Sequence, residues 1–362
     1  MTAPAARHIL TFAQTLDGGG VERVQLRLAE DWLAAGRRVT LLLGCDAGPL
    51  AAERPRGLEL VPLGAPAYHR LYAAPRHVRA LAPDAIFCPG NHYTSVAAWI
   101  RLRLGNACPP IVAKASNTFV RGDQGRLTAA GYRAWLKLHP RFVDHLVALS
   151  PALAAEAGAM TGLPAGRVGV IPNPPARYAA DPAPPALPEH RFVLGVGRLE
   201  PQKRWDRLIA AFARIADREA RLVILGEGRA RGALEAQVGA LGLGARVSLP
   251  GHALDPRPAL ARAGVVALTS DFEGMPGVLR EALALGTPVV ATAASPAVRE
   301  IVSSAALGSI VPPGEDDALV AALDHWLAPG RARPAPVPEP GIGAAEAYLE
   351  LFDRLVAARF RA

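Results

Sequence analysis

Short apolar runs alternate with segments of helical periodicity along the whole chain, and the runs predict two successive series of β-strands. The first series is expected at His8 to Ala13, Val39 to Leu43, Leu58 to Leu63, Ala85 to Cys88, Ile111 to Ala115 and Leu146 to Leu149. The second is expected at Phe192 to Val196, Leu222 to Leu225, Val247 to Leu249, Val265 to Leu268, Val289 to Ala293 and Ser309 to Val311. Runs that are apolar throughout are typical of parallel sheets covered by helices on both faces. The predicted fold class is therefore α/β, with two doubly wound domains.

Helical patterns and proline-rich stretches divide these series. Helices are expected at Val21 to Ala35, Trp205 to Ala216, Ala230 to Leu241 and about Ala344 to Ala358. The stretches Pro172 to Pro188 and Pro329 to Pro340 are too rich in proline for helix or sheet. We therefore expect an N-terminal domain over 1–175, a linker over 176–190 and a C-terminal domain over 191–342. A cleft between two such domains would suit two substrates, since ligands bind beyond the carboxyl ends of the strands.

Charge and composition narrow the classes of partner. The net charge of +8 suits an acidic partner such as a nucleotide, a phospholipid surface or nucleic acid. We prefer a solvated arginine-rich surface to nucleic-acid binding, because no zinc-finger or helix-turn-helix pattern is present. Cys45, Cys88 and Cys108 are widely spaced, so we expect buried thiols of a reduced cytosol and no metal site. No apolar run approaches the roughly 20 residues that span a bilayer, and the N-terminus is unlike a secretory signal. The expected location is cytoplasmic.

The segment from Ser270 to Ala293 carries the clearest chemistry. Glu273 follows an apolar strand, and Glu281 lies in a helix expected to open at Gly274, Met275 and Pro276 and to end at Gly286. The free N–H groups at the start of a helix favour phosphate. A carboxylate there repels phosphate, so we expect it to accept hydrogen bonds from hydroxyl groups. Phosphate and polyol together indicate a nucleotide-sugar.

Two cations and several glycines extend this interpretation. Arg198 and Lys203 lie between the first strand and helix of the second domain, where they could clamp a diphosphate. Lys203 is one of only three lysines in the chain. The glycines at 18–20 permit close approach of an anion, although an empty turn is the commoner explanation. The glycines at 226 and 228 are interpreted as a turn, and the pattern of a Rossmann dehydrogenase is incomplete.

The N-terminal domain offers weaker candidates. Asn91 and His92 follow the strand Ala85 to Cys88, where they either contact a sugar or acceptor or are ordinary loop residues. A basic stretch from Arg121 to Arg141 is either a membrane-facing surface or a solvated helix, and the second interpretation is preferred. Its cations are Arg121, Arg126, Arg133, Lys137 and Arg141.

The chain resembles the retaining glycosyltransferases of family 4, also described as group 1 glycosyl transferases. The matching pieces are GGGVERVQLRLAEDWLAAGRRVTLL near the start and, in the second domain, GRLEPQKRWDRLIAAF, LVILGEGRARGALE, VSLPGH, SDFEGMPGVLREALALGTPVVAT, REIV and VPPGEDDAL. The rest of the first domain matches only at SNTF and LVALSPAL. The resemblance implies the GT-B fold, two Rossmann-like domains facing across a cleft. It also implies that the terminal helix, 343–362, packs back onto the first domain.

The resemblance assigns roles to individual residues. It gives Arg198 and Lys203 to the donor diphosphate, Glu273 to the hydroxyls of the transferred sugar and Glu281 to the ribose. The backbone of four residues would cradle sugar and phosphate, and two glycines would face the phosphates from the first domain. These are Gly274, Met275, Gly277 and Val278, and then Gly19 and Gly20.

The chain departs from the family pattern at two places in the second domain. Pro276 stands where many members have glycine, and Ala294, Ser295 and Pro296 replace a common Gly-Gly. In the first domain, the histidine that some members place near the reaction centre has no secure counterpart. Pro89, Asn91 and His92 compete for that position.

The implied reaction moves a hexose or N-acetylhexosamine, with retention, from a nucleoside diphosphate to a hydroxyl. The donor would be UDP- or GDP-linked, no metal or other cofactor is expected, and the acceptor would be a glycan, a lipid-linked saccharide or a small molecule in cell-surface polysaccharide or glycoconjugate synthesis. A lipid-linked acceptor would bring the protein to the inner face of the membrane. The alternatives are a nucleotide-sugar 2-epimerase of the same fold and a non-catalytic nucleotide-sugar-binding subunit.

Overall fold

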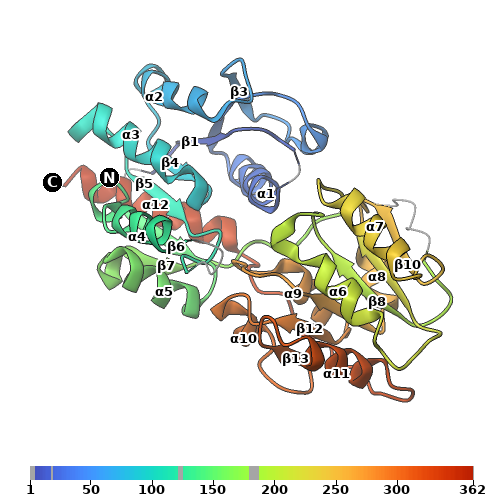
Figure 1. Ribbon diagram of the computed structural model, residues 1–362. Coiled ribbons are helices and arrows are strands. Elements are labelled where there is room, and N and C mark those ends of the chain that lie inside the picture. Colours follow the sequence, from blue (N-terminus) through green and yellow to red (C-terminus); the bar gives the residue numbers. More distant parts are fainter. Residues whose placement is uncertain (1–4, 18, 121–124, 179–186, 362) are drawn as a thin grey trace. The chain divides into compact units, whose positions relative to one another are not determined.

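The chain folds into two compact units. The computed structural model describes residues 5–17, 19–120, 125–178 and 187–361 (Figure 1). The N-terminal unit comprises the described residues up to 175 together with 340–361, and the C-terminal unit comprises those from 176 to 339. Each unit has its own parallel sheet.

The sheet of the N-terminal unit has seven strands in the order β3-β2-β1-β4-β5-β6-β7. Its strands are β1 His8–Ala13, β2 Arg38–Leu43, β3 Glu59–Pro62, β4 Ala85–Cys88, β5 Ile111–Lys114, β6 His145–Ala148 and β7 Val168–Val170. Its helices are α1 Gly20–Ala34, α2 Ala74–Leu81, α3 Thr94–Leu104, α4 Arg126–Leu136, α5 Pro151–Thr161 and α12 Ala344–Arg359. The strand order reverses between β1 and β4, where a doubly wound sheet opens a crevice for ligands.

The C-terminal unit repeats this plan with six strands in the order β10-β9-β8-β11-β12-β13. The strands are β8 Phe192–Val196, β9 Arg221–Leu225, β10 Val247–Gly251, β11 Val265–Leu268, β12 Val289–Thr292 and β13 Gly308–Val311. The helices are α6 Trp205–Phe212, α7 Arg231–Ala240, α8 Arg257–Arg262, α9 Gly277–Ala284, α10 Pro296–Ile301 and α11 Asp316–Leu327. The equivalent reversal lies between β8 and β11, which pair directly.

The last helix, α12, packs in the core of the N-terminal unit although it is the final segment of the chain (Figure 1). Trp32 of α1 makes edge-to-face contacts with Tyr348 and Phe352 of α12, at centroid distances of 6.0 and 5.4 Å. Asp353 accepts hydrogen bonds from the backbone N–H of Ala6, at 2.7 Å, and from Arg37, at 2.8 Å. Aromatic burial and these polar contacts therefore hold the helix to the start of the chain.

The structure differs from the predicted elements in two instructive places. The strand β7 was not predicted, because it is only three residues long, contains Gly169 and is not fully buried. The helix α9 begins at Gly277, and not at Gly274 to Pro276 as predicted. Pro276 precedes the helix with a ψ of 97°, so it is the N-cap residue and not the first helical residue. In the described parts of both proline-rich stretches there is no helix or strand.

Candidate functional site

The strongest candidate site lies at the carboxyl ends of β8 and β11 in the C-terminal unit. The loop after β8 carries Arg198 and Lys203, and the loop after β11 carries Glu273. Because β8 and β11 are adjacent parallel strands, both loops emerge at the same edge of the sheet. This is the point where the strand order reverses.

Lys203 and Glu273 meet directly at this edge. The Lys203 Nζ lies 2.6 Å from Glu273 Oε1, and the Ser270 hydroxyl donates to the same oxygen, also at 2.6 Å. Glu273 is only 8 % exposed, so its carboxylate is held in a defined position by these two donors. The fold therefore brings together Lys203 and Glu273, two predicted site residues that are 70 positions apart in the sequence.

Other hydrogen bonds brace the two loops against each other. The Thr269 hydroxyl donates to the carbonyl groups of Lys203 and Arg204, at 3.1 and 3.0 Å. The side-chain amide of Gln202 donates to the carbonyl of Phe272 at 2.7 Å, and the backbone carbonyl of Gln202 accepts from the N–H of Asp271 at 2.9 Å. These bonds fix the backbone that carries Lys203 and Glu273.

Arg204 adopts a strained backbone conformation within this braced region. Its φ of 51° is in the left-handed region that non-glycine residues rarely adopt. Its guanidinium forms ion pairs with Asp206 at 3.0 Å and Asp271 at 3.3 Å, and Arg207 reaches Asp271 at 3.2 Å. The ion pairs hold the chain in a turn that places the preceding residue, Lys203, toward the sheet edge.

The glycines of the predicted turn at 226–228 have a packing role. A Cβ on Gly226 would lie 2.0 Å from the carbonyl oxygen of Gly197, and one on Gly228 would lie 2.4 Å from that of Leu199. The N–H of Leu199 also donates to the carbonyl of Glu227 at 2.8 Å. The loop after β9 therefore supports the loop that carries Arg198 and Lys203, which only glycine allows at this distance.

Glu281 lies one turn into α9 and faces the start of that helix. A Cβ on Gly277 would lie 3.4 Å from Glu281 Oε1, so glycine leaves room for the carboxylate beside the first N–H groups of the helix. Tyr178 donates its hydroxyl to Glu281 Oε2 at 2.8 Å. Its ring lies under the guanidinium of Arg257, 4.9 Å from the ring centroid.

The segment that replaces the family's Gly-Gly supports the Glu273 loop. The Ser295 hydroxyl donates to the carbonyl of Gly274 at 2.8 Å, and the N–H of Glu273 donates to the carbonyl of Ala294 at 3.0 Å. Gly274 and Pro276 are buried, Met275 and Val278 are half-buried, and Gly277 is exposed at the helix start. Ser295, which stands where many family members have glycine, thus adds a side-chain hydrogen bond to the loop that carries Glu273.

Arg198 differs from Lys203 in being exposed. Its carbonyl accepts a hydrogen bond from Trp205 Nε1 at 3.0 Å, which fixes its backbone. Among the described residues its guanidinium forms no ion pair, so this edge of the sheet carries a positive group able to meet an anion.

The corresponding edge of the N-terminal unit has a different character. Gly19 is the N-cap of α1 and Gly20 its first residue, with open space around the Cα of Gly20. A Cβ on Gly19 would lie 2.0 Å from Glu22 Oε2, so the Glu22 carboxylate occupies the space beside this helix start. Tyr93 donates its hydroxyl to Glu22 Oε1 at 3.1 Å. The binding of phosphate by Gly19 and Gly20 remains a prediction. The neighbouring Glu22 carboxylate carries the same sign of charge as a phosphate.

Asn91 and His92 lie in the short turn that follows β4. Asn91 Oδ1 accepts from the N–H of Ser116 at 2.8 Å, and its Nδ2 donates to the carbonyl of Asn117 at 3.0 Å, so this side chain ties two loops together. His92 contacts the rings of Tyr68 and Tyr93, at centroid distances of 4.7 and 5.2 Å. Partial burial lowers the pKa of His92, which the Glu22 carboxylate partly offsets.

The basic stretch maps onto α4 and the turn after it, apart from Arg121, which lies outside the described residues. The side chains of Arg126, Arg133, Lys137 and Arg141 are exposed. Trp135 instead stacks on Phe142 at a centroid distance of 5.4 Å. Membrane contact by this stretch stays a prediction.

Two further findings concern metals and membranes. The described ranges contain no cluster of three or more side chains suited to a metal ion. Of the helices in the described ranges, none has the length and apolarity required to cross a bilayer.

Sequence reasoning missed several residues that shape the site. Tyr178 and Thr269 contribute hydrogen bonds that no motif indicates, because their partners are distant in the sequence. Ser270 lies only three positions before its partner Glu273, but no pattern in the sequence indicates that its hydroxyl bonds to this carboxylate. Arg204 and Arg207 were visible only as charges beside Lys203, and their common partner Asp271 precedes Glu273 by two positions. The arginines beside Lys203 and the aspartate beside Glu273 were the one feature of the sequence that could have indicated ion pairs between the two loops.

Comparison with known proteins identifies the families to which the two units are similar. Residues 180–335 match the sequence profile of the family "Glycosyl transferases group 1", and residues 19–174 match that of the "Glycosyl transferase 4-like domain". The chain is 34 % identical over 145 residues to an N-acetylgalactosaminyltransferase of Campylobacter jejuni that acts on a diphospho-undecaprenol saccharide, covering 40 % of each chain. It is 29 % identical over 192 residues to the lipopolysaccharide 1,6-galactosyltransferase of Salmonella typhimurium, covering 51 % of this chain and 53 % of that one. The chain thus spans about half or less of these curated relatives.

Solved structures share the fold over nearly the whole chain. HepE of Anabaena, in complex with UDP and glucose, superimposes with a TM-score of 0.71 at 21 % identity, covering 98 % of both chains. The apo form of the lipopolysaccharide outer core galactosyltransferase WaaB gives a TM-score of 0.64 at 20 % identity, also covering 98 % of both. The two units therefore have the GT-B fold, and the chain is a glycosyltransferase-family protein with a glycosyl transferase 4-like domain over 19–174 and a group 1 glycosyl transferase domain over 180–335.

Proposed function

We propose that this chain transfers a hexose or N-acetylhexosamine from a nucleoside diphosphate to a hydroxyl group, with retention at the anomeric carbon. The observation that carries the proposal is the contact of Lys203 with Glu273 at the edge of β8 and β11, beside the start of α9. A cation, a carboxylate and free helix N–H groups at one edge are what a sugar diphosphate requires.

In this proposal Lys203 and Arg198 bind the diphosphate and stabilise the charge that develops on it. The bond between the anomeric carbon and the diphosphate oxygen breaks, a bond to the acceptor oxygen forms on the same face, and the acceptor proton passes to the departing phosphate. Glu273, held in place by the Ser270 hydroxyl, accepts hydrogen bonds from the hydroxyls of the transferred sugar. Glu281 accepts hydrogen bonds from the ribose hydroxyls. Preorganised charges at a developing anion are typically the largest contribution to such catalysis.

Donor and acceptor classes are inferred from relatives. HepE was solved with UDP and glucose, which favours a UDP-linked donor, with a GDP-linked donor as the second candidate. The printed activities of the Campylobacter and Salmonella relatives concern a lipid-linked saccharide and a lipopolysaccharide. We therefore propose an acceptor of this class, a role in cell-surface glycoconjugate synthesis and a site of action at the inner face of the membrane, with no metal needed.

The proposal is tested by product analysis with purified protein. UDP- and GDP-sugars are first screened for thermal stabilisation, because a ligand that binds only the folded state raises the unfolding temperature. The stabilising donor is then incubated with and without lipid-linked saccharides. Acceptor-dependent release of the nucleoside diphosphate, with an α-linked product from an α-linked donor, is expected.

The other functions considered give different products. Formation of an epimer from UDP-N-acetylglucosamine alone would indicate the 2-epimerase. Donor binding without turnover on any acceptor would favour the non-catalytic subunit. Near-normal turnover in a folded Lys203→Ala, Glu273→Ala double variant would sink the assignment of the site.

A further inference from the structure

Four ring side chains of the N-terminal unit are in contact one after another. They are His92, Tyr68, Tyr72 and Trp99, which we call the aromatic strip. The ring centroids are 4.7 Å apart between His92 and Tyr68, 6.0 Å between Tyr68 and Tyr72, and 6.3 Å between Tyr72 and Trp99. His92 and Tyr72 are exposed, and Tyr68 and Trp99 are half-buried. The strip therefore presents part of each of its rings to solvent.

The strip begins at the carboxyl edge of the sheet and continues along α3. His92 lies in the turn after β4, and Tyr68 and Tyr72 belong to the 3-10 helix η2, Tyr68–Ala73. Trp99 lies in α3, seven residues after His92, so a rise of about 1.5 Å per residue separates the two by about 10 Å. This distance exceeds the width of one sugar ring, so the strip has the length to contact an oligosaccharide.

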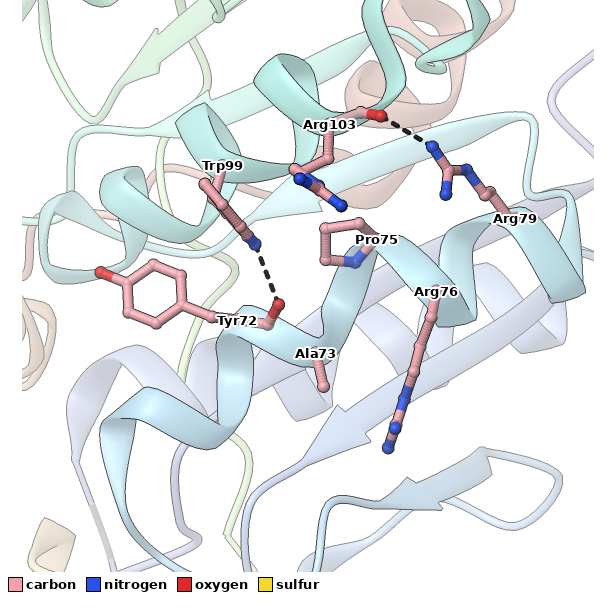
Figure 2. Close-up of a pocket in the computed structure, with 7 residues that line it drawn as sticks. All are labelled: Tyr72, Ala73, Pro75, Arg76, Arg79, Trp99 and Arg103. Atoms are coloured by element: carbon pink, nitrogen blue, oxygen red, sulfur yellow. Dashed lines mark hydrogen bonds between the residues drawn. The ribbon is translucent and has the colours of Figure 1, made fainter.

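Hydrogen bonds hold the rings of the strip in place. The Tyr72 hydroxyl donates to Ser95 Oγ at 3.1 Å, and this Ser95 hydroxyl also lies 2.8 Å from the Tyr68 hydroxyl. Tyr68 donates in turn to the carbonyl of His92 at 2.6 Å. Trp99 Nε1 donates to the carbonyl of Tyr72 at 3.0 Å (Figure 2). Because these rings are already ordered, a ligand that stacks on them loses little affinity to the cost of ordering side chains.

Two arginines lie at the Trp99 end of the strip. The Arg103 guanidinium lies over the Trp99 ring, 5.3 Å from the centroid, and Arg79 donates to the carbonyl of Arg103 at 2.8 Å (Figure 2). Both arginines are exposed, and they line a pocket of about 220 Å³ together with Tyr72 and Trp99. Within the described ranges neither of them pairs with a carboxylate. An arginine has five N–H donors, so both retain donors for an anionic group of a ligand.

Packing alone explains only part of this arrangement. The hydrogen bonds among the rings join η2 to α3, and Arg79 and Arg103 lie in the last turns of their helices, where a cation complements the helix dipole. Packing does not explain why the rings of Tyr72 and His92 are left exposed in a chain with only 6 % aromatic residues. Aromatic rings that combine an apolar face with a polar group are instead typical of binding surfaces.

The chemistry of the strip matches a saccharide that carries a carboxylate. One face of a pyranose ring is lined by C–H bonds and can stack on an aromatic ring, while the hydroxyls at its rim hydrogen-bond to phenol and imidazole groups. The planar fork of an arginine matches the two oxygens of a carboxylate. Successive rings that end in arginines without a carboxylate partner therefore suit several linked sugars, of which at least one is acidic.

We propose that the aromatic strip binds an acidic oligosaccharide, as the part of the acceptor that lies beyond the reacting sugar. The reacting sugar is placed at the His92 end, at the carboxyl edge of the sheet, and a uronate carboxylate meets Arg79 and Arg103. This inference rests on the proposed function, because it names the class of acceptor. It makes the strip the element that selects acceptors by their length and charge.

The test is the binding of saccharides to the full-length protein, measured by isothermal titration calorimetry without a donor. The probes are a hyaluronan hexasaccharide, in which glucuronate alternates with N-acetylglucosamine, a hyaluronan disaccharide, and chitohexaose, which is neutral and also has six sugars. The acidic hexasaccharide should bind at least about tenfold more tightly than the disaccharide, because it reaches several rings. It should bind at least about fivefold more tightly than chitohexaose, because it also reaches the arginines.

Two variants separate stacking from charge. Tyr72→Leu keeps an apolar side chain but removes the ring, so both hexasaccharides should bind about fivefold more weakly. Arg103→Gln should weaken the acidic hexasaccharide about fivefold and change chitohexaose by less than about twofold, a difference that general damage to the fold would not produce. Phe360→Leu and Arg56→Gln alter an exposed ring and an exposed arginine of the same unit outside the strip, and should bind like the wild type.

Unfolding midpoints that match the wild type are required of each variant, and Arg103→Gln decides the question if Tyr72→Leu does not fold. Three results would overturn the proposal. The first is wild-type protein that binds neither hexasaccharide. The second is equal affinity for the acidic hexasaccharide and for the disaccharide or chitohexaose. The third is Tyr72→Leu and Arg103→Gln variants that bind like the two controls.

Failure of the proposed function would give a different result. Saccharide binding that follows the predicted order, without transfer from any UDP- or GDP-sugar, would contradict the proposed reaction and leave the binding strip intact. Transfer by a wild-type protein that does not bind the hexasaccharides would contradict the strip alone.

Discussion

Each unit places a lysine at the carboxyl edge of its sheet, but the two lysines have very different surroundings. Lys203 has a side chain that is 17 % exposed and lies against Glu273. Lys114, at the end of β5, is 2 % exposed, its Nζ is 3.5 Å from Asn173 Oδ1, and burial lowers its pKa to about 8. One topology therefore supports a partly exposed lysine in an ion pair in one unit and an enclosed amine in the other.

The neighbouring residues follow the same division. In the N-terminal unit Asn91 is committed to Ser116 and Asn117, and Glu22 to Tyr93. In the C-terminal unit Arg198 is exposed and has no carboxylate partner among the described residues. The comparison teaches that the shared fold fixes where polar residues gather, and that their bonding decides whether they are available to a ligand.

The sharpest way to break this comparison is to remove the accessible lysine. We expect Lys203→Ala to lower transfer at least about a hundredfold, because it removes a preorganised cation at the developing diphosphate charge. Release of nucleoside diphosphate from the stabilising donor measures the effect. Arg214→Ala, an exposed arginine of the same unit that pairs with Asp317, is the matched control and should transfer normally.

The enclosed lysine should affect stability and not donor binding. Unfolded lysine has a pKa of 10.5 and folded Lys114 one of about 8, so the native state has released its proton between these values while the unfolded state still binds one. Stability of the wild type relative to Lys114→Met should therefore rise between pH 8 and 10.5, by about 3 kcal/mol.

Denaturant unfolding of both proteins across this pH range measures that difference. Taking the difference cancels the cysteines and tyrosines that titrate in the same range. A flat difference would mean that the Lys114 amine is not enclosed in the folded protein.

Asn91 tests whether the N-terminal edge is structural. Asn91→Ala removes two side-chain hydrogen bonds between the loops after β4 and β5, and we expect a loss of about 2 kcal/mol in the free energy of unfolding. Donor affinity, measured by calorimetry, should not change. Intact stability with strongly reduced transfer would instead assign Asn91 to the reaction.

The smallest expected effects concern the ribose contact. Glu281→Gln should weaken donor binding about tenfold, since a charged acceptor becomes a neutral one. Tyr178→Phe removes only the hydroxyl that orients this carboxylate, and about threefold weaker binding is expected. A Tyr178→Phe effect as large as that of Glu281→Gln would mean that Tyr178 contacts the donor itself.

The sequence predicts most of the fold because buried parallel strands are apolar throughout. Twelve strands were predicted and found, with ends shifted by at most two residues, and only the short β7 escaped the pattern. The start of α9 was misplaced because proline fits both the N-cap and the first helical turn, and only its ψ of 97° distinguishes the two.

Only the site residues that lie within recognisable sequence motifs could be predicted. Lys203 and Glu273 were each predicted from their loops, but their direct contact depends on the pairing of β8 with β11. Tyr178 lies in a proline-rich stretch without periodicity, so nothing in the sequence indicates its bond to Glu281. Glu22 appears as an ordinary residue in the first turn of a helix, and only the backbone of Gly19 reveals that its carboxylate fills the space beside that turn.

The most direct test of the account is the affinity for UDP and GDP of three proteins, measured by isothermal titration calorimetry. These are the wild type, Lys203→Ala, and Lys137→Ala, which removes the exposed third lysine of the chain from the N-terminal unit. We predict that the nucleotide that binds the wild type will bind Lys203→Ala at least about tenfold more weakly and Lys137→Ala unchanged. Equal affinity of the wild type and a folded Lys203→Ala would contradict the assignment of the donor site to the edge of β8 and β11.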